Sequence, residues 1–384
     1  MNLTHKIALD LTCKQRRYFA RAAGTHRFTY NWGLSEWNRQ YEAGAKPNGN
    51  KLKLQFNALY PEQFPWVGDV HRDCHSQPFA DLQNAWSNFF KGLADKPSFK
   101  KKNQNRPSFY CANDKLRLDG MRVRLPVLGW VRMREALRFS GKVMSARVVQ
   151  ECEQWFVCIA VDVNEAVKLR TEDGVVGVDL GITTLATLST GERIENPKPL
   201  RKAQERLRRA NRKLHRRIKG SNNRNKQRRV VAKIHRRVRN IRHDTLHKLT
   251  TQLCRKNQTV VIEDLNVKGM VKNHRLAQSI SDASFGLFRT LLTYKSKLYG
   301  NRIVVADRFY PSSKTCSLCG QVKAKLSLAE RMYQCECGLN LDRDLNAAIN
   351  LEQLAEAFGK GTPAETPVGV VETGTNPWLQ VATL

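Results

Sequence analysis

Three acidic residues stand where a carboxylate is expensive to bury. Asp179 ends an apolar run, Val175–Val178, and Glu263 follows another, Val260–Ile262. Asp344 opens an expected helix. A carboxylate in such a place is either a satisfied structural residue or a metal ligand. Together the three suit two-metal hydrolysis of phosphodiester bonds, because Mg²⁺ prefers hard oxygen ligands and two ions about 3.5–4 Å apart can share them. We expect all three to be catalytic and to hold two Mg²⁺ ions.

Two of these residues have acidic neighbours. Asp264 follows Glu263, and strand alternation sends their side chains to opposite faces, so only one of them should share a site with Asp179. Asp342 lies two residues before Asp344, and the local pattern alone does not choose between them.

Four cysteines form a second cluster with metal-binding spacing. Cys316 and Cys319 make one close pair, Cys335 and Cys337 make another, and a glycine follows each pair. Such pairs close a tetrahedral site around one ion, and the glycines permit tight turns. We expect one structural Zn²⁺, with iron in the same geometry or free thiols as the alternatives. The remaining six cysteines lack such spacing and are expected to be core residues or inert thiols.

The chain is strongly basic. Its 384 residues include 66 Lys and Arg against 34 Asp and Glu, a formal net charge of +32. An imbalance on this scale indicates a polyanionic partner, and nucleic acid is the obvious one, although a basic protein without such a partner is the alternative. No apolar run approaches the roughly 18–20 residues that span a membrane, and no secretory signal is evident at the start. We therefore expect no membrane partner.

Much of this charge lies in one stretch, Arg201–Arg242, which holds a single acidic residue, Glu205. Apolar residues recur there at helical spacing on both sides of a break at 220–223, which predicts a helical hairpin with a thin apolar seam. The expected seam residues are Leu207, Leu214, Ile218, Val231, Ile234, Val238 and Ile241. Opposite charges that would support a solvated helix are missing, so we expect phosphate contacts. The candidates are Arg208, Arg209, Arg216, Arg217, Arg228, Arg229, Lys233 and Arg236.

The rest of the chain divides by periodicity. The first hundred residues read as helical, with aromatic stripes such as Tyr30, Leu34, Trp37 and Tyr41 that we assign to a core. Residues 115–163 alternate between apolar and basic positions, which predicts an antiparallel, barrel-like β module whose basic face is either solvated or a nucleic-acid contact. Residues 360–384 lack periodicity and are expected to be a disordered tail.

Four motifs, in order, resemble those of the TnpB family, which bacterial insertion sequences encode. They are Gly177–Ile182, Val261–Leu265, Phe309–Gly320 and Asp342–Ala348, and the resemblance extends over about residues 1–358, including Leu125–Arg132. In the family's pattern the third catalytic carboxylate is Asp344, and this resemblance selects it over Asp342.

The resemblance implies an α+β multidomain fold, in which a helical recognition domain is inserted in a β-barrel wedge domain. A RuvC (RNase H-like) α/β domain with a zinc-ribbon insert follows. The implied boundaries are 1–10 and 97–170 for the wedge, 11–96 for recognition, 171–308 for RuvC with the basic hairpin at 200–250, 309–341 for the ribbon, and 342–359 for the last RuvC helix.

The implied activity is RNA-guided cleavage of double-stranded DNA beside a short adjacent motif. Its implied partners are a guide RNA from the element's end and target double-stranded DNA, in a monomeric ribonucleoprotein in the cytoplasm of a prokaryote, acting at the nucleoid. A guided DNA-binding regulator that does not cut is the first alternative, although the three carboxylates are retained. A transposase or transposition accessory protein is the second, and a zinc-ribbon transcription factor is the third.

Overall fold

The computed structural model describes residues 2–102, 104–163, 174–327 and 330–359. The chain divides between Glu165 and Ala166 into two compact units, which are described separately. The expected disordered tail, 360–384, lies outside the described residues.

The first unit carries a helical layer whose core is aromatic. Its helices are α1 (Cys13–Glu42), α2 (Gly49–Gln63) and α3 (Asp73–Phe90), with a 3₁₀ turn at Pro65–Asp69. Helix α1 begins at a capping box between Thr12 and Gln15, which satisfies backbone donors at its first turn. Trp37 and Trp86 stack with ring centroids 5.5 Å apart in the buried cluster that joins the three helices. Tyr41, expected in this core, is 56% exposed because it lies on the last turn of α1.

The strands of the first unit form one seven-stranded sheet in the order β2-β6-β7-β1-β5-β4-β3. The strands are β1 (Asn2–Asp10), β2 (Ser108–Ala112), β3 (Arg117–Asp119), β4 (Arg122–Leu125), β5 (Gly129–Met133), β6 (Lys142–Glu151) and β7 (Gln154–Asp162), and a 3₁₀ turn lies at Asn113–Lys115. The order ends at β2 and β3, and no pairing between these two is found within the described residues, so a closed barrel is not confirmed.

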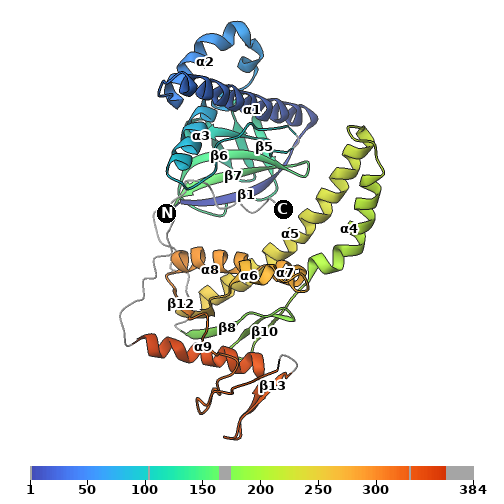
Figure 1. The fold of residues 1–384 in the computed structure, drawn as a ribbon. Coiled ribbons are helices and arrows are strands. Elements are labelled where there is room, and N and C mark those ends of the chain that lie inside the picture. The colour runs from blue at the N-terminus through green and yellow to red at the C-terminus, as the bar shows by residue number, and fades with distance from the viewer. Residues whose placement is uncertain (1, 103, 164–173, 328–329, 360–384) are drawn as a thin grey trace. The chain divides into compact units, whose positions relative to one another are not determined.

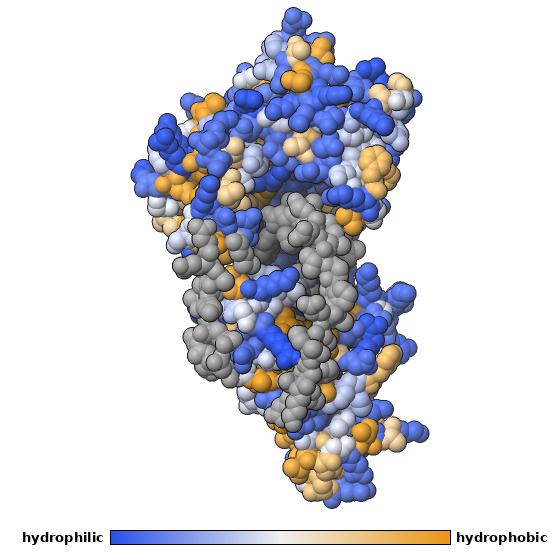
Figure 2. Space-filling view, turned by 90° about the vertical axis from the view of Figure 1, so that its left-hand side faces the viewer, coloured by the Kyte–Doolittle hydropathy of each residue, from blue (hydrophilic) through white to orange (hydrophobic). Residues whose placement is uncertain are grey.

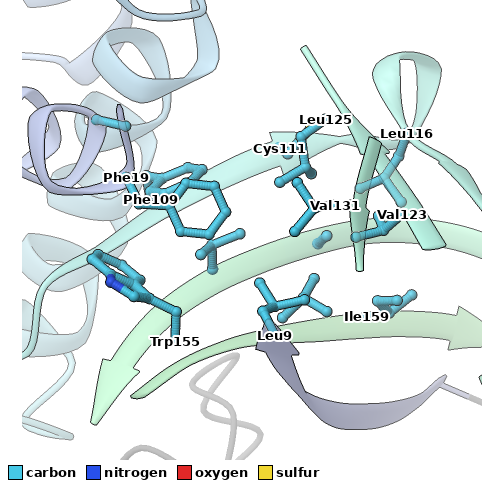
Figure 3. Packing of buried hydrophobic residues seen from close by; sticks show 14 of the residues in the cluster. Leu9, Phe19, Phe109, Cys111, Leu116, Val123, Leu125, Val131, Trp155 and Ile159 are labelled. Carbon is cyan, nitrogen blue, oxygen red and sulfur yellow. The ribbon is translucent and has the colours of Figure 1, made fainter. Parts of the chain in front are cut away.

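Apolar side chains from both halves of this sheet meet in a single core (Figure 3). Phe19 of α1 lies in it against Phe109 and Trp155, with ring centroids 5.2 Å away in each case. Val123 and Val131 are fully buried, as the alternating pattern predicts. The intervening arginines of β4 and β5 are exposed, so this unit has a basic outer face.

The second unit is built on a five-stranded sheet in the order β10-β9-β8-β11-β12 (Figure 1). Its strands are β8 (Val175–Asp179), β9 (Thr184–Leu188), β10 (Arg193–Glu195), β11 (Thr259–Glu263) and β12 (Arg302–Ala306). Strands β8, β11 and β12 run parallel, whereas β9 pairs antiparallel with β8, and β10 with β9. The carboxyl ends of β8 and β11 therefore meet at one edge of the sheet.

Helices connect and cover these strands. They are α4 (Pro199–His215), α5 (Asn222–Lys256), α6 (Val267–Val271), α7 (Ala277–Ala283) and α8 (Phe285–Tyr299). Helices α4 and α5 form the expected basic hairpin, which Figure 1 shows extending away from the sheet. Leu207, Ile234 and Val238 are buried, but Ile218 is 81% exposed, so its predicted place in the seam is wrong. Ile218 lies beyond the end of α4, in the turn where the two helices no longer face each other.

The last elements of the second unit are a small ribbon and a helix that returns to the sheet. The ribbon contains β13 (Met332–Gln334) and β14 (Asn340–Asp342), and helix α9 (Arg343–Gly359) follows directly. Helix α9 packs closely on β8, because a Cβ at Gly177 would lie 1.9 Å from the carbonyl oxygen of Ala348. Glycine at 177 therefore sets how near α9 comes to the strand that carries Asp179.

Candidate active site and metal centre

Three elements bring the predicted carboxylates to one region. Asp179 is the last residue of β8 and Glu263 the last of β11. These strands are parallel neighbours, with Val178 in register with Ile262, so the two carboxylates lie next to each other at the same sheet edge. Asp344 lies in the first turn of α9, the helix that packs on β8 through Gly177. The sequence gives no direct sign that Asp344 lies near the other two carboxylates, except for the glycine two residues before Asp179.

The electrostatics of Asp179 indicate mutual repulsion among these groups. Burial, and then the charges of Glu263 and Asp344, raise the pKa of Asp179 to about 8, while Arg343 opposes the shift. A carboxylate surrounded in this way holds its proton unless a cation relieves the repulsion. The donor set is all oxygen, which suits Mg²⁺ better than a softer ion. The residues present therefore fit a divalent cation at this edge.

The structure adds a residue to this site that the sequence did not suggest. Ser312 is 4% exposed, and its hydroxyl donates a hydrogen bond of 2.5 Å to Oε1 of Glu263. This bond fixes one carboxylate oxygen and leaves Oε2 for another partner. Serine has no periodic signal in a loop, and only its place in the segment before Cys316 could have drawn attention to it.

Asp264 and Asp342, the acidic neighbours, have separate partners. Asp264 accepts hydrogen bonds from Arg289 at 2.6 Å and Arg308 at 2.5 Å, and these bonds lower its pKa. Oδ1 of Asp342 accepts the backbone N–H of Asp344 at 3.1 Å, and its Oδ2 lies 2.9 Å from Arg193. Asp342 therefore caps α9 and holds the first turn in which Asp344 lies.

The four predicted cysteines converge in the ribbon. The Sγ atoms of Cys316, Cys319, Cys335 and Cys337 all lie within 4.8 Å of one another. Burial opposes ionisation of Cys316, but N–H groups of the following residues bond to its sulfur and lower its pKa to about 6. Gly320 and Gly338 adopt positive φ values of 76° and 90°, as the two tight turns require. Four sulfur donors in this arrangement fit one tetrahedral thiophilic ion such as Zn²⁺.

Two buried amides link this ribbon to the carboxylate site. Nδ2 of Asn350 donates to the carbonyl oxygens of Ser312 and Thr315, each at 2.7 Å. Nδ2 of Asn346 also donates to Thr315 at 2.7 Å, and its Oδ1 accepts the N–H of Ser317 at 3.0 Å. Helix α9 therefore holds the chain on both sides of Cys316, and the same chain carries the hydroxyl that contacts Glu263.

Of the eight cationic candidates of the hairpin, seven are exposed to solvent and Arg236 is half-buried. Arg209 pairs with Glu205 at 3.0 Å. The base of the hairpin is fixed by Asp282, which accepts the backbone N–H groups of Leu200 and Arg201 at 3.0 Å and pairs with Arg242 at 3.1 Å. The hairpin is therefore anchored at its base and carries mostly exposed cationic side chains.

A second cluster of possible metal ligands lies in the first unit and consists of His71, Asp73 and Cys111. Asp73 already accepts the N–H of Ala112 at 2.9 Å and pairs with Lys115 at 3.0 Å. The ring of His71 lies between the hydroxyl of Tyr18 and the carbonyl oxygen of Tyr110. These groups satisfy one another, so we interpret the cluster as a structural polar network.

None of the helices in the described part of the chain is both long and apolar enough to span a bilayer. In the first unit, Figure 2 shows a mostly hydrophilic surface with scattered apolar residues on the face in view.

Comparison with solved structures gives the class of fold. The chain is similar to a protein solved by cryo-electron microscopy in a Cas12f1–sgRNA–target DNA complex, with a TM-score of 0.58 over 89% of this chain and 83% of that one. The sequences are only 13% identical, so the similarity concerns the fold alone. The mixed α/β fold of this chain is thus one shared with Cas12f1.

Sequence comparisons give the family. Residues 156–274 match a family described as "Probable transposase" (OrfB of IS605), and 285–351 match a Cas12f1-like TNB domain. Residues 1–46 match a domain described as helix-turn-helix, although here they hold β1 and the single helix α1.

Two relatives carry the description "Putative RNA-guided DNA endonuclease". One, from Streptomyces pristinaespiralis, is 40% identical over 88% of this chain and 86% of its own length. The other, InsQ of Escherichia coli K12, is 32% identical over 88% of each chain. Proteins described as TnpB-like, from Acanthamoeba polyphaga mimivirus, match over 34% of the chain at 36% identity. The chain belongs to the TnpB family.

Proposed function

We propose that this protein is an RNA-guided DNA endonuclease of a mobile element, and that Asp179, Glu263 and Asp344 are its catalytic residues. The observation that carries the proposal is that Asp179 and Glu263 end two neighbouring parallel strands and Asp344 lies in the first turn of the helix packed on them. Burial, together with the charges of Glu263 and Asp344, raises the pKa of Asp179 to about 8. Homologues described as endonucleases support the DNA substrate and the RNA guide. The retained carboxylates count against a regulator that only binds.

The residues have distinct parts in hydrolysis. Two Mg²⁺ ions, when bound, would activate the attacking water and stabilise the leaving oxygen. The residues that would hold these ions are Asp179, Glu263 and Asp344, whose ligand atoms are the hard carboxylate oxygens that Mg²⁺ prefers. Ser312 orients Glu263, and Asp342 holds the turn that positions Asp344.

The other parts of the chain would select and hold the nucleic acids. We assign residues 1–10 and 97–170 to a barrel-like wedge, 11–96 to recognition, 171–308 and 342–359 to RuvC, and 309–341 to a zinc ribbon with one structural Zn²⁺. The hairpin within 200–250 would bind guide-RNA phosphates, and the basic face of the wedge would contact nucleic acid. Guide pairing would read the target sequence, while the protein reads the adjacent motif. The particle would be a monomeric ribonucleoprotein.

The test is cleavage of a plasmid by protein co-expressed with its native downstream element end. The target carries a randomised flank, and parallel reactions contain Mg²⁺ or EDTA. Linearisation that depends on Mg²⁺ and selects one flank is the expected result, and it also identifies the adjacent motif. If RNA copurifies and the target is bound but never cut, the protein is a regulator and the catalytic assignment is wrong.

A further inference from the structure

Phe309 is the most exposed large apolar side chain among the described residues, with 87% of its surface accessible. It lies three residues after the end of β12, in the segment that leads from the sheet to the ribbon. A phenylalanine in this position forgoes the stabilisation that burial of its ring would bring. Its exposure therefore needs an explanation outside the folding of this unit.

The ring is not carried by a loose segment. Oδ1 of Asp307 accepts the N–H of Phe309 at 2.8 Å, and the carbonyl oxygen of Asp307 accepts the N–H of Tyr310 at 3.0 Å. On one side Arg308 bonds to Asp264 at 2.5 Å. On the other side Tyr310 packs against the buried cluster that joins β11, β12 and α9. The backbone is held on both sides, and the ring projects from a fixed turn.

This turn lies close to the proposed catalytic carboxylates. Ser312, whose hydroxyl is 2.5 Å from Glu263, is three residues farther along the chain. At about 3.3–3.6 Å per residue, the Cα atoms of Phe309 and Ser312 are at most ~11 Å apart. A strand with a phosphate at the carboxylates would therefore place a nearby nucleotide within reach of the ring.

We propose that Phe309 is a stacking platform for an unpaired base of the nucleic-acid strand that enters the carboxylate site. The inference rests on the proposed function, because it takes the ligand to be that enzyme's substrate strand. The formal charge of +32 favours a polyanion over a neutral partner. Bases within a duplex already have both faces covered, so an exposed ring is suited to a single strand. Stacking uses the face that every base has, so the contact should tolerate any sequence.

The experiment measures the affinity of the full-length protein with its RNA for a short single-stranded DNA. An Asp179→Ala background prevents cutting, and a second set of DNAs carries one abasic position at each place in turn. Phe309→Ala should weaken binding of intact DNA by about 5- to 150-fold, the range for one base stacked on an aromatic ring. It should not weaken binding further when the abasic position coincides with the stacked base.

Three variants serve as controls. Phe309→Trp should retain the affinity, whereas Phe309→Leu, which keeps an apolar side chain but has no ring, should behave like Phe309→Ala. Leu318→Ala removes another exposed apolar side chain, 69% accessible, in the ribbon and should have no effect. Figure 2 shows apolar residues gathered near the bottom of the view, at the height at which Figure 1 draws the ribbon. The Leu318→Ala control therefore tests whether loss of any exposed apolar side chain weakens DNA binding.

Each outcome decides the question. Unchanged binding by Phe309→Ala, or equal losses on intact DNA and on every abasic DNA, would overturn the inference. Loss of self-association without loss of DNA affinity would assign the ring to a protein contact and also overturn it. If Phe309→Ala weakens binding of intact DNA but not of one abasic DNA, and the protein with Asp179 intact never cuts, the proposed function alone is refuted. If that protein cuts guided targets but Phe309→Ala shows no such difference between intact and abasic DNA, the stacking role alone is refuted.

Discussion

Replacing Ser312 by alanine removes the hydroxyl that contacts Glu263 and little else. The side chain is buried, so no water can readily take the hydroxyl's place. The carbonyl oxygen of Ser312, which accepts from Asn350, is unaffected by the change. The expected defect is therefore a Glu263 carboxylate that is free to turn away from the position in which it would bind a cation.

The magnitude follows from the kind of bond. A hydrogen bond to a charged group contributes about 1.5–3 kcal/mol. If that energy serves to orient Glu263, its loss corresponds to roughly 10- to 150-fold weaker cation binding, at about 1.4 kcal/mol per factor of ten. The stability of the fold should fall by much less than it would for a core truncation, because no large apolar group is lost.

The assay combines Mn²⁺ binding, measured by electron paramagnetic resonance, with plasmid cleavage over a range of Mg²⁺ concentrations. Ser312→Ala should require more of either ion, while guided DNA binding stays normal. Ser312→Thr keeps the hydroxyl and should recover much of the affinity, and Ser313→Ala is the control for the neighbouring position. Equal cation requirements in Ser312→Ala and the unaltered protein would refute the reasoning.

Three further changes test other parts of the account. Replacing the arginines at 208, 209, 216 and 217 by glutamine should reduce the slope of log affinity for RNA against log salt by about 3, as measured by filter binding. Lysine replacements, which keep the charge, should leave the slope as it is. An unchanged slope in the glutamine variant would place the RNA elsewhere. Cys319→Ser should lower the zinc content and slow cleavage through the Asn346 and Asn350 contacts, and Cys13→Ser, at an exposed cysteine outside the ribbon, should do neither. Gly177→Ala should destabilise the second unit by roughly 1–3 kcal/mol or more, seen as a lower Tm, because its Cβ would meet Ala348. Gly286→Ala, with open space around it, is the matched control, and an equal Tm for the two would contradict the packing argument.

The sequence predicted what depends on local pattern. Apolar runs before Asp179 and Glu263 predicted two strands, and the structure shows them as parallel neighbours. The cysteine spacing predicted a cluster, and the four sulfurs converge. Alternation in the β module predicted which side chains of β4 and β5 are buried. In each case the signal is a local pattern of residue types along the chain, whereas the pairing of β8 with β11 joins distant segments.

What the sequence could not settle depends on contacts between distant residues. Asp342 and Asp344 look alike along the chain, and only the hydrogen bond from the N–H of Asp344 identifies Asp342 as a cap. Ile218 has the spacing of a seam residue, but the helices separate before reaching it. Ser312 contacts a residue 49 positions away, and no pattern of period two or 3.6 signals such a bond. Closure of the seven-stranded sheet likewise depends on pairing of its end strands and stays a prediction.

The central claim is that the three carboxylates cut DNA at a site the guide RNA selects. The most direct measurement compares the unaltered ribonucleoprotein with Asp179→Ala, following both binding and cleavage of one matched target in Mg²⁺. We expect guided binding to be equal in the two proteins and cleavage to be lost in the variant. Cleavage that survives Asp179→Ala, or guided binding that disappears with it, would contradict the account.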